Sequence, residues 1–260
     1  MIILRVGNVA DYDVVSRKEH LDDFERDYNG SQHVVALGPT GRGKTRLLKE
    51  HLKRVITPDK PVIILHGKIK NRDPEVQGLA KELNLRRIAM LPGKTRQRYD
   101  REVRKYNGYL LIPLDKPMDE REEYDALHDN FRAGIRQNYR TRKRQTITYV
   151  DEAHQVQHDL KLKSACENVL MRGAPDNAMW SASQRGRWLS YHTYNAPEHM
   201  FVFYDDNREE RKRYGDFGEA DPDEIEYITS KLKKERVPDG RTISQCLYIR
   251  RGGGMYVIDT

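Results

Sequence analysis

The stretch GPTGRGKT, from Gly38 to Thr45, matches the pattern G-x-x-x-x-G-K-[ST] at every defined position. An apolar run precedes it and an amphipathic run follows it, which predicts the strand, loop and helix in which such a loop cradles a triphosphate. The glycines let backbone N–H groups point at the β-phosphate, and the helix start adds positive potential. Lys44 would then reach the β- and γ-phosphate oxygens, and Thr45 would ligate Mg²⁺. The predicted nucleotide-binding residues are Gly38, Pro39, Thr40, Gly41, Arg42, Gly43, Lys44, Thr45 and Arg46.

Two carboxylates follow a second apolar run, in TITYVDEAH. Asp151 and Glu152 stand at the end of this predicted strand, and the carboxyl ends of parallel strands meet at one edge of a sheet. We therefore expect both beside the phosphate loop, with Asp151 as a metal ligand and Glu152 as the base that polarises a water. With Lys44 as a further catalytic candidate, the second carboxylate favours hydrolysis, because a small-molecule kinase usually has no use for a base that activates water.

A third apolar run, Ala178 to Ser183, ends at Gln184 in NAMWSASQRGRW. An amide there can hydrogen-bond both the γ-phosphate and the attacking water. Arginines flank this strand, and an arginine delivered by a neighbouring subunit can stabilise transition-state charge. The residues alone leave open which arginine acts, with a solvated surface position as the alternative for each. The candidates are Arg172, Arg185 and Arg187.

The segments LGPTGRGKT, ITYVDEAH and MRGAPDNAMWSASQRGR resemble the FtsK–HerA superfamily of DNA-translocating P-loop ATPases. In size the chain looks like the viral genome-packaging branch, and the resemblance covers about residues 31–205. It implies a RecA-like P-loop NTPase fold of the ASCE type. It also implies that Lys44 and Thr45 bind ATP with Mg²⁺ and that Asp151 and Glu152 form the acidic pair.

The same resemblance implies a glutamine sensor at Gln184 and a trans-acting arginine at Arg172. Family members work as rings, usually hexamers, that pull duplex DNA through a central pore. It therefore implies self-association and, for a packaging enzyme, a capsid portal or vertex as partner. Gly186 stands where the family usually has a proline after the Gln-Arg pair.

Two other classes of protein share parts of this pattern. DEAH, SAS and QRGR look like motifs of superfamily 2 helicases, in which the third motif belongs to a second motor domain far downstream. Here QRGR follows SAS directly. A nucleotide switch or small-molecule kinase would also use the phosphate loop. The chain lacks the N-K-x-D signature of GTPases, and a kinase would leave Glu152 unexplained.

The composition favours a polyanionic partner. Lys and Arg number 47 against 40 Asp and Glu, which gives a formal charge of +7. Two basic segments, 86–105 and 132–144, are the candidate contacts with double-stranded DNA, with solvated helix faces as the alternative. Cys166 and Cys246 are far apart and fit neither a zinc site nor a disulfide framework. The apolar runs are too short to span a bilayer. We expect a soluble, cytoplasmic protein without a membrane partner.

Short apolar runs alternate with amphipathic segments, which predicts an α/β fold with a mostly parallel sheet and helices on both faces. Asp221 and Pro222 predict a helix start near the C-terminus, and the glycines at 252–254 predict a terminal hairpin. The chain is expected to form one domain, 1–260, with a core at about 31–205 and an extension at 206–260. Strands are predicted near 2–6, 33–37, 61–66, 109–113, 146–150, 178–183 and 200–204, and helices at 44–57, 74–84 and 119–143.

Overall fold

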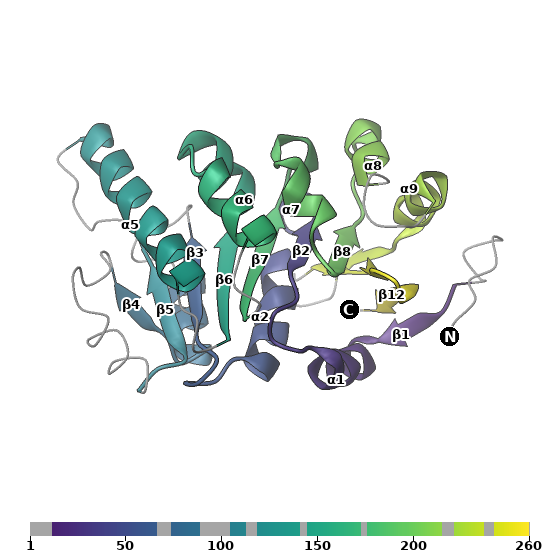
Figure 1. Ribbon diagram of the computed structural model, residues 1–260. Coiled ribbons are helices and arrows are strands. Elements are labelled where there is room, and N and C mark those ends of the chain that lie inside the picture. The colour runs from purple at the N-terminus through teal and green to yellow at the C-terminus, as the bar shows by residue number, and fades with distance from the viewer. Residues whose placement is uncertain are drawn as a thin grey trace.

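The computed structural model describes residues 12–66, 74–88, 105–112, 119–140, 145–172, 176–214, 221–236 and 242–259. In these residues ten strands form one sheet (Figure 1). Only β11 of this sheet runs antiparallel to its neighbours. The spatial order is β1 (Val14–Ser16), β12 (Gly254–Asp259), β11 (Cys246–Arg250), β8 (His199–Phe203), β2 (Val34–Leu37), β7 (Asn177–Ser183), β6 (Thr146–Asp151), β3 (Val62–His66), β5 (Gly108–Leu111) and β4 (Arg86–Ile88).

The central strands are buried along their whole length, because helices cover both faces of the sheet. This explains their continuous apolar runs, such as VVAL in β2 and VIILH in β3. A parallel pair also needs a crossover connection, and helices supply it here. The expected mostly parallel α/β sheet is confirmed.

Helices lie on both faces of the sheet (Figure 1). On one face, Phe24 and Leu48 belong to an apolar cluster with the inner residues of the strands. On the other, Phe131, Val169 and Ile228 do the same. The first group of helices is α1 (Arg17–Asp27), α2 (Lys44–Val55) and α3 (Pro74–Glu82). The second is α5 (Glu120–Arg140), α6 (Lys163–Arg172), α7 (Tyr191–Asn195), α8 (Arg208–Tyr214) and α9 (Pro222–Lys231), with the π-helix η2 (Gln155–Asp159) and the 3₁₀ turn η3 (Gly186–Trp188).

The predicted C-terminal elements are present, and they extend the main sheet. Asp221 caps α9, accepting a hydrogen bond from Asp223 N at 2.9 Å, with Pro222 in the first turn. Strands β11 and β12 form the expected hairpin, and β11 pairs with β8 of the core. Strand β12 in turn pairs with β1 near the N-terminus. A second small sheet, β9 (Lys234–Arg236) with β10 (Thr242–Ser244), was not predicted.

The other predicted strands and helices are found within one or two residues of their expected bounds wherever the chain is described. The predicted strand at 2–6, most of the basic segment 86–105 and the end of the helix predicted to 143 lie outside the described residues. Helix α1 and strand β4 were not predicted. Among the described helices, none has both the length and the apolar character needed to cross a bilayer.

A buried pair of histidines joins α1 to the helix that follows the phosphate loop. His51 Nδ1 lies 2.7 Å from the carbonyl oxygen of Leu47, so it must carry a proton and donate. With both rings neutral, His20 Nε2 donates to His51 Nε2 at 2.8 Å, and the Tyr256 hydroxyl donates to His20 Nδ1 at 2.7 Å. Burial lowers the pKa of His20 to about 3 and the pKa of His51 well below 6.5.

This pair predicts a loss of stability in mild acid. The pKa values of both histidines are below 6.5 in the folded state. Their contribution to the free energy of unfolding is therefore fully present above pH 6.5, and it falls toward pH 3 because the unfolded chain takes up protons that the folded chain does not. Each such histidine steepens the fall by about 1.4 kcal/mol per pH unit. Urea unfolding at several pH values between 7 and 5 gives the free energy of unfolding as a function of pH. This free energy should fall less steeply toward acid for His20→Gln than for the wild-type protein. The control His158→Gln, at an exposed site, should follow the wild-type curve. Equal slopes for all three proteins would contradict the assignment.

Candidate nucleotide-binding site

The predicted phosphate loop connects β2 to α2, as its sequence required. Gly38 has φ 143°, and a Cβ there would lie 2.7 Å from the Cβ of Phe203, so only glycine fits. Gly43 has φ 95° and directly precedes α2, with nothing within 4 Å of the position that a Cβ would take. The inner side of the loop is therefore open at the point where the N-terminus of α2 provides positive potential.

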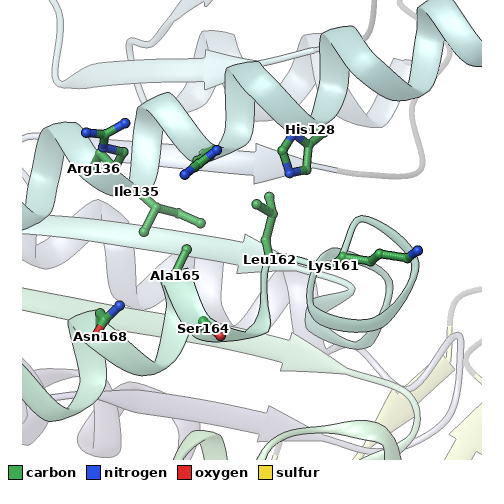
Figure 2. Close-up of a pocket in the computed structure, with 9 residues that line it drawn as sticks. His128, Ile135, Arg136, Lys161, Leu162, Ser164, Ala165 and Asn168 are labelled. Carbon is green, nitrogen blue, oxygen red and sulfur yellow. The ribbon is translucent and has the colours of Figure 1, made fainter.

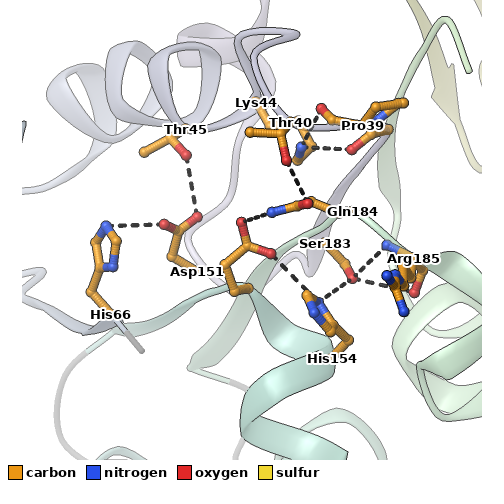
Figure 3. Close-up of polar contacts among 12 residues, drawn as sticks. Pro39, Thr40, Lys44, Thr45, His66, Asp151, His154, Ser183, Gln184 and Arg185 are labelled. Carbon is orange, nitrogen blue, oxygen red and sulfur yellow. Dashed lines mark hydrogen bonds and ion pairs between the residues drawn. The ribbon is translucent and has the colours of Figure 1, made fainter. Parts of the chain in front are cut away.

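Two basic side chains of the loop lie inside the fold. The Lys44 ammonium donates to the carbonyl oxygens of Gly38 at 2.6 Å and Pro39 at 2.8 Å (Figure 3). The Arg42 guanidinium is 5% exposed, lies 4.9 Å from the ring centroid of Tyr204 and pairs with Asp206 at 3.4 Å. Its Nη1 is buried and has no hydrogen-bond partner in the described part of the chain. Such a buried cationic donor beside an open loop fits an anionic ligand such as a triphosphate.

The two predicted metal ligands lie side by side. The Thr45 hydroxyl donates to Asp151 Oδ1 at 3.2 Å (Figure 3). The Tyr149 hydroxyl donates to the same oxygen at 2.9 Å, and His66 Nε2 lies 3.0 Å from Oδ2. Burial, with the nearby Asp151 carboxylate, raises the pKa of Tyr149 well above 10, so the phenol keeps the proton that it donates. A hydroxyl and a carboxylate are the protein oxygens with which Mg²⁺ is usually held beside phosphates, so this donor set fits the ion.

The predicted base is held in an uncommon conformation. Glu152 has φ 54°, in the left-handed region that a non-glycine residue enters at a cost of about 1–2 kcal/mol, and is 7% exposed. Its Oε1 accepts a hydrogen bond from Gln184 Nε2 at 2.5 Å, and Gln184 Oε1 accepts one from the Thr40 hydroxyl at 2.5 Å (Figure 3). Gln184 thus bridges the phosphate loop and Glu152.

Sheet order explains why these residues meet. Strand β7 lies between β2 and β6, so Gln184 follows a strand end between the phosphate loop and Glu152. The strands also end in register, with Leu37 opposite Ser183. On the other side of β6, His66 is opposite Asp151. The expectation that three strand ends place these side chains together is met by the geometry.

Two histidines at this edge were not predicted from the sequence. His66 is the last residue of β3 and contacts Asp151 as described. His154 Nδ1 lies 3.5 Å from Glu152 Oε2 and 3.3 Å from the Ser183 hydroxyl. The available signals were the histidine that ends the predicted strand VIILH and the H of DEAH, which follows another predicted strand by a few residues.

The structure does not bring Arg172 to the loop of its own subunit. Arg172 is the last residue of α6 and precedes β7, whereas Gln184 follows the other end of that strand. Seven strand residues span about 20 Å. Arg185 is closer in the chain to the site and exposed, with its guanidinium carbon 5.1 Å from the ring centroid of Trp188. Arg187 lies 3.5 Å from Glu210. Arg172 therefore lies away from the phosphate loop of its own subunit.

Comparison with known proteins supports the fold. The DNA-packaging ATPase B204 of Sulfolobus turreted icosahedral virus superposes with a TM-score of 0.57 at 14% identity, over 87% of this chain and 96% of that one. The genome packaging NTPase B204 of Sulfolobus turreted icosahedral virus 2, in complex with AMPPCP, gives 0.55 at 15% identity, over 88% and 97%. No family model matches the sequence.

A curated relative also matches part of the chain. The molybdate/tungstate import ATP-binding protein WtpC of Thermococcus kodakarensis is 38% identical over 81 residues. The match covers 31% of this chain and only 23% of that protein. The chain therefore has the P-loop NTPase fold found in viral genome-packaging ATPases, which confirms the fold expected from the resemblance to the FtsK–HerA superfamily.

Proposed function

We propose that this protein is an ATP-hydrolysing motor that translocates double-stranded DNA and packages a viral genome into a capsid. The observation that carries the proposal is the meeting of Lys44, Asp151, Glu152 and Gln184 at the carboxyl edge of one sheet. The structural neighbours whose names include genome or DNA packaging support the choice of substrate. ATP and Mg²⁺ are the cofactors, and one domain, 1–260, carries the motor.

Each side chain has a distinct part in the proposed reaction. Lys44 and the loop N–H groups would bind the phosphates, while Thr45 and Asp151 would hold Mg²⁺. When bound, the ion would supply positive charge that offsets the negative charge of the phosphates. Glu152 takes the proton of the attacking water as the oxygen that joins the β- and γ-phosphates leaves with ADP. The Gln184 amide occupies Oε1 of this carboxylate. A γ-phosphate that attracts Thr40 and Gln184 would free Glu152 from this amide, so Glu152 would act as a base only when a γ-phosphate is bound.

The remaining parts of the proposal concern partners. The net charge of +7 and the basic segments 86–105 and 132–144 support a duplex DNA substrate. The position of Arg172, away from its own loop, supports a ring, which we propose to be a hexamer, in which this arginine serves a neighbour. Such a motor would dock at a portal or vertex of the capsid and act in the host cytoplasm.

Steady-state ATP hydrolysis tests this function. The purified protein should hydrolyse ATP, and duplex DNA should stimulate it more than single-stranded DNA or RNA of the same length. Raising the salt concentration should weaken the stimulation, because phosphate contacts release counterions. Stimulation by single strands or RNA alone would favour a helicase or remodelling ATPase. Absence of hydrolysis under every condition would contradict the proposal.

His66 should tune the metal site without contacting the nucleotide. Its imidazole orients the Asp151 carboxylate, and loss of such a supporting contact typically costs 10- to 100-fold in metal affinity. The measurement is the Mg²⁺ concentration needed for half-maximal binding of a fluorescent ATP analogue. We expect His66→Phe to raise this concentration about 10- to 100-fold. The control His128→Phe changes an imidazole of α5 that pairs with Asp129 rather than Asp151, and it should leave the titration unchanged. A wild-type Mg²⁺ requirement in the His66 variant would show that the contact is only structural.

A further inference from the structure

A groove between α5 and α6 lies outside the nucleotide site. It has a volume of about 570 Å³, and Figure 2 shows its lining. Ile135 of α5 faces Leu162 and Ala165 at its apolar floor, where the two helices pack. The polar lining is mainly basic, and no carboxylate is among the described residues that line it. The basic lining residues are His128, Arg132, Arg136 and Lys161.

The basic residues of α5 form a row. His128, Arg132 and Arg136 are spaced by four residues, so they lie along one edge of the helix, and all three line the groove. Figure 2 labels the first and the last of them. Eight helical residues span about 12 Å. His128 Nδ1 is 3.1 Å from its neighbour Asp129, which leaves the two arginines as the main cations of the row. Like charges one turn apart repel each other, and a bound anion would relieve this repulsion.

The α6 side of the groove adds positive potential. Lys161 adopts φ 53°, a left-handed conformation that is strained for lysine, and lies two residues before the start of α6. The first turn of α6 contains no acidic side chain, so no carboxylate of that turn offsets the positive potential of the helix N-terminus. The Arg132 and Arg136 guanidinium groups have no ion-pair partner in the segments that the structure describes. Cations thus border both sides of the groove.

We infer that this groove binds the sugar–phosphate backbone of the translocated DNA. The inference rests on the proposed function, because it takes DNA as the ligand. A row about 12 Å long suits successive phosphates of one strand better than a single compact anion. Backbone contacts carry no base preference, which is what a motor that moves any sequence requires. Within the basic segment 132–144, two described residues, Arg132 and Arg136, are therefore assigned as the contacts with DNA.

The experiment compares two double variants of equal charge change. Arg132→Gln/Arg136→Gln removes the row, and Arg121→Gln/Arg208→Gln removes two exposed arginines elsewhere, on α5 and α8. Binding of a fluorescent 30-base-pair duplex of mixed sequence is measured by anisotropy over a range of salt concentrations. Each lost phosphate contact reduces the slope of log K against log salt by about 0.9. We expect the groove variant to lose about 1.8 from this slope and the control variant to keep it.

Other results would overturn the inference. Equal losses in both variants would mean that only net charge attracts DNA, and unchanged slopes in both would mean that the groove does not contact DNA. A groove variant that changes its oligomeric state in sedimentation, with DNA binding per assembled particle unaltered, would identify a subunit contact. Absence of duplex binding by the wild-type protein would overturn both this inference and the proposed DNA substrate. If the groove variant loses this salt slope but the wild-type protein hydrolyses no ATP, the result would support DNA binding at the groove and contradict the proposed motor function.

Discussion

Glu152→Gln is expected to bind ATP about as tightly as the wild-type protein and to hydrolyse it about 10²- to 10⁴-fold more slowly, the usual contribution of a general base. The amide has the shape of the carboxylate but cannot take a proton from water. It can still hydrogen-bond Gln184 across the 2.5 Å contact, so the site should remain assembled. Single-turnover hydrolysis and equilibrium binding of a fluorescent ATP analogue measure the two effects separately.

The matched control for this variant is Glu209→Gln, which makes the same chemical change on the exposed surface of α8. It should hydrolyse ATP at the wild-type rate. Thermal unfolding of both variants shows whether the backbone of residue 152, with φ 54°, tolerates the change. Wild-type turnover by a folded Glu152→Gln protein would mean that another group activates the water.

Arg172→Ala is expected to lower ATP turnover by about 10³-fold or more if this arginine completes the site of a neighbour. Arg172 precedes β7, at the end of that strand opposite to Gln184, so it does not reach the phosphate loop of its own subunit. The effect should therefore depend on the neighbouring subunit. In rings that mix Arg172→Ala with Lys44→Ala, activity should reappear, because the second variant retains Arg172 and the first retains a complete phosphate loop.

Arg185 provides the comparison within the same experiment. This exposed arginine follows Gln184 directly, near its own nucleotide site. If Arg185→Ala rather than Arg172→Ala is inactive and is rescued in mixed rings, the trans-acting residue is Arg185. If mixed rings form and neither variant is rescued, catalysis across subunits is excluded for both arginines.

Much of the site could be predicted because its parts are local in sequence. The phosphate loop is one continuous motif, and Asp151, Glu152 and Gln184 each follow an apolar strand. Parallel strands placed side by side bring their carboxyl ends together, whatever their order in the chain. The spacing within the site then follows from the register of β2, β6 and β7.

The unpredicted parts depend on contacts between distant segments. His66 ends one strand and meets Asp151 only because β3 and β6 are neighbours in register. Strand β1 has three residues and exists by pairing with β12, over 240 residues later in the chain. Helix α1 was missed because its sequence, RKEHLDDFERD, is mostly charged and buries only three residues, His20, Leu21 and Phe24. Pattern alone carries little signal for such elements.

The central claim is that three strand ends form one ATP-hydrolysing site, and a structure of Glu152→Gln with ATP and Mg²⁺ tests it most directly. The account predicts the triphosphate inside the loop of Gly38 to Thr45, the ion against Thr45 and Asp151, and the Gln184 amide turned toward the γ-phosphate. A nucleotide bound elsewhere, or a γ-phosphate out of reach of residues 152 and 184, would contradict it.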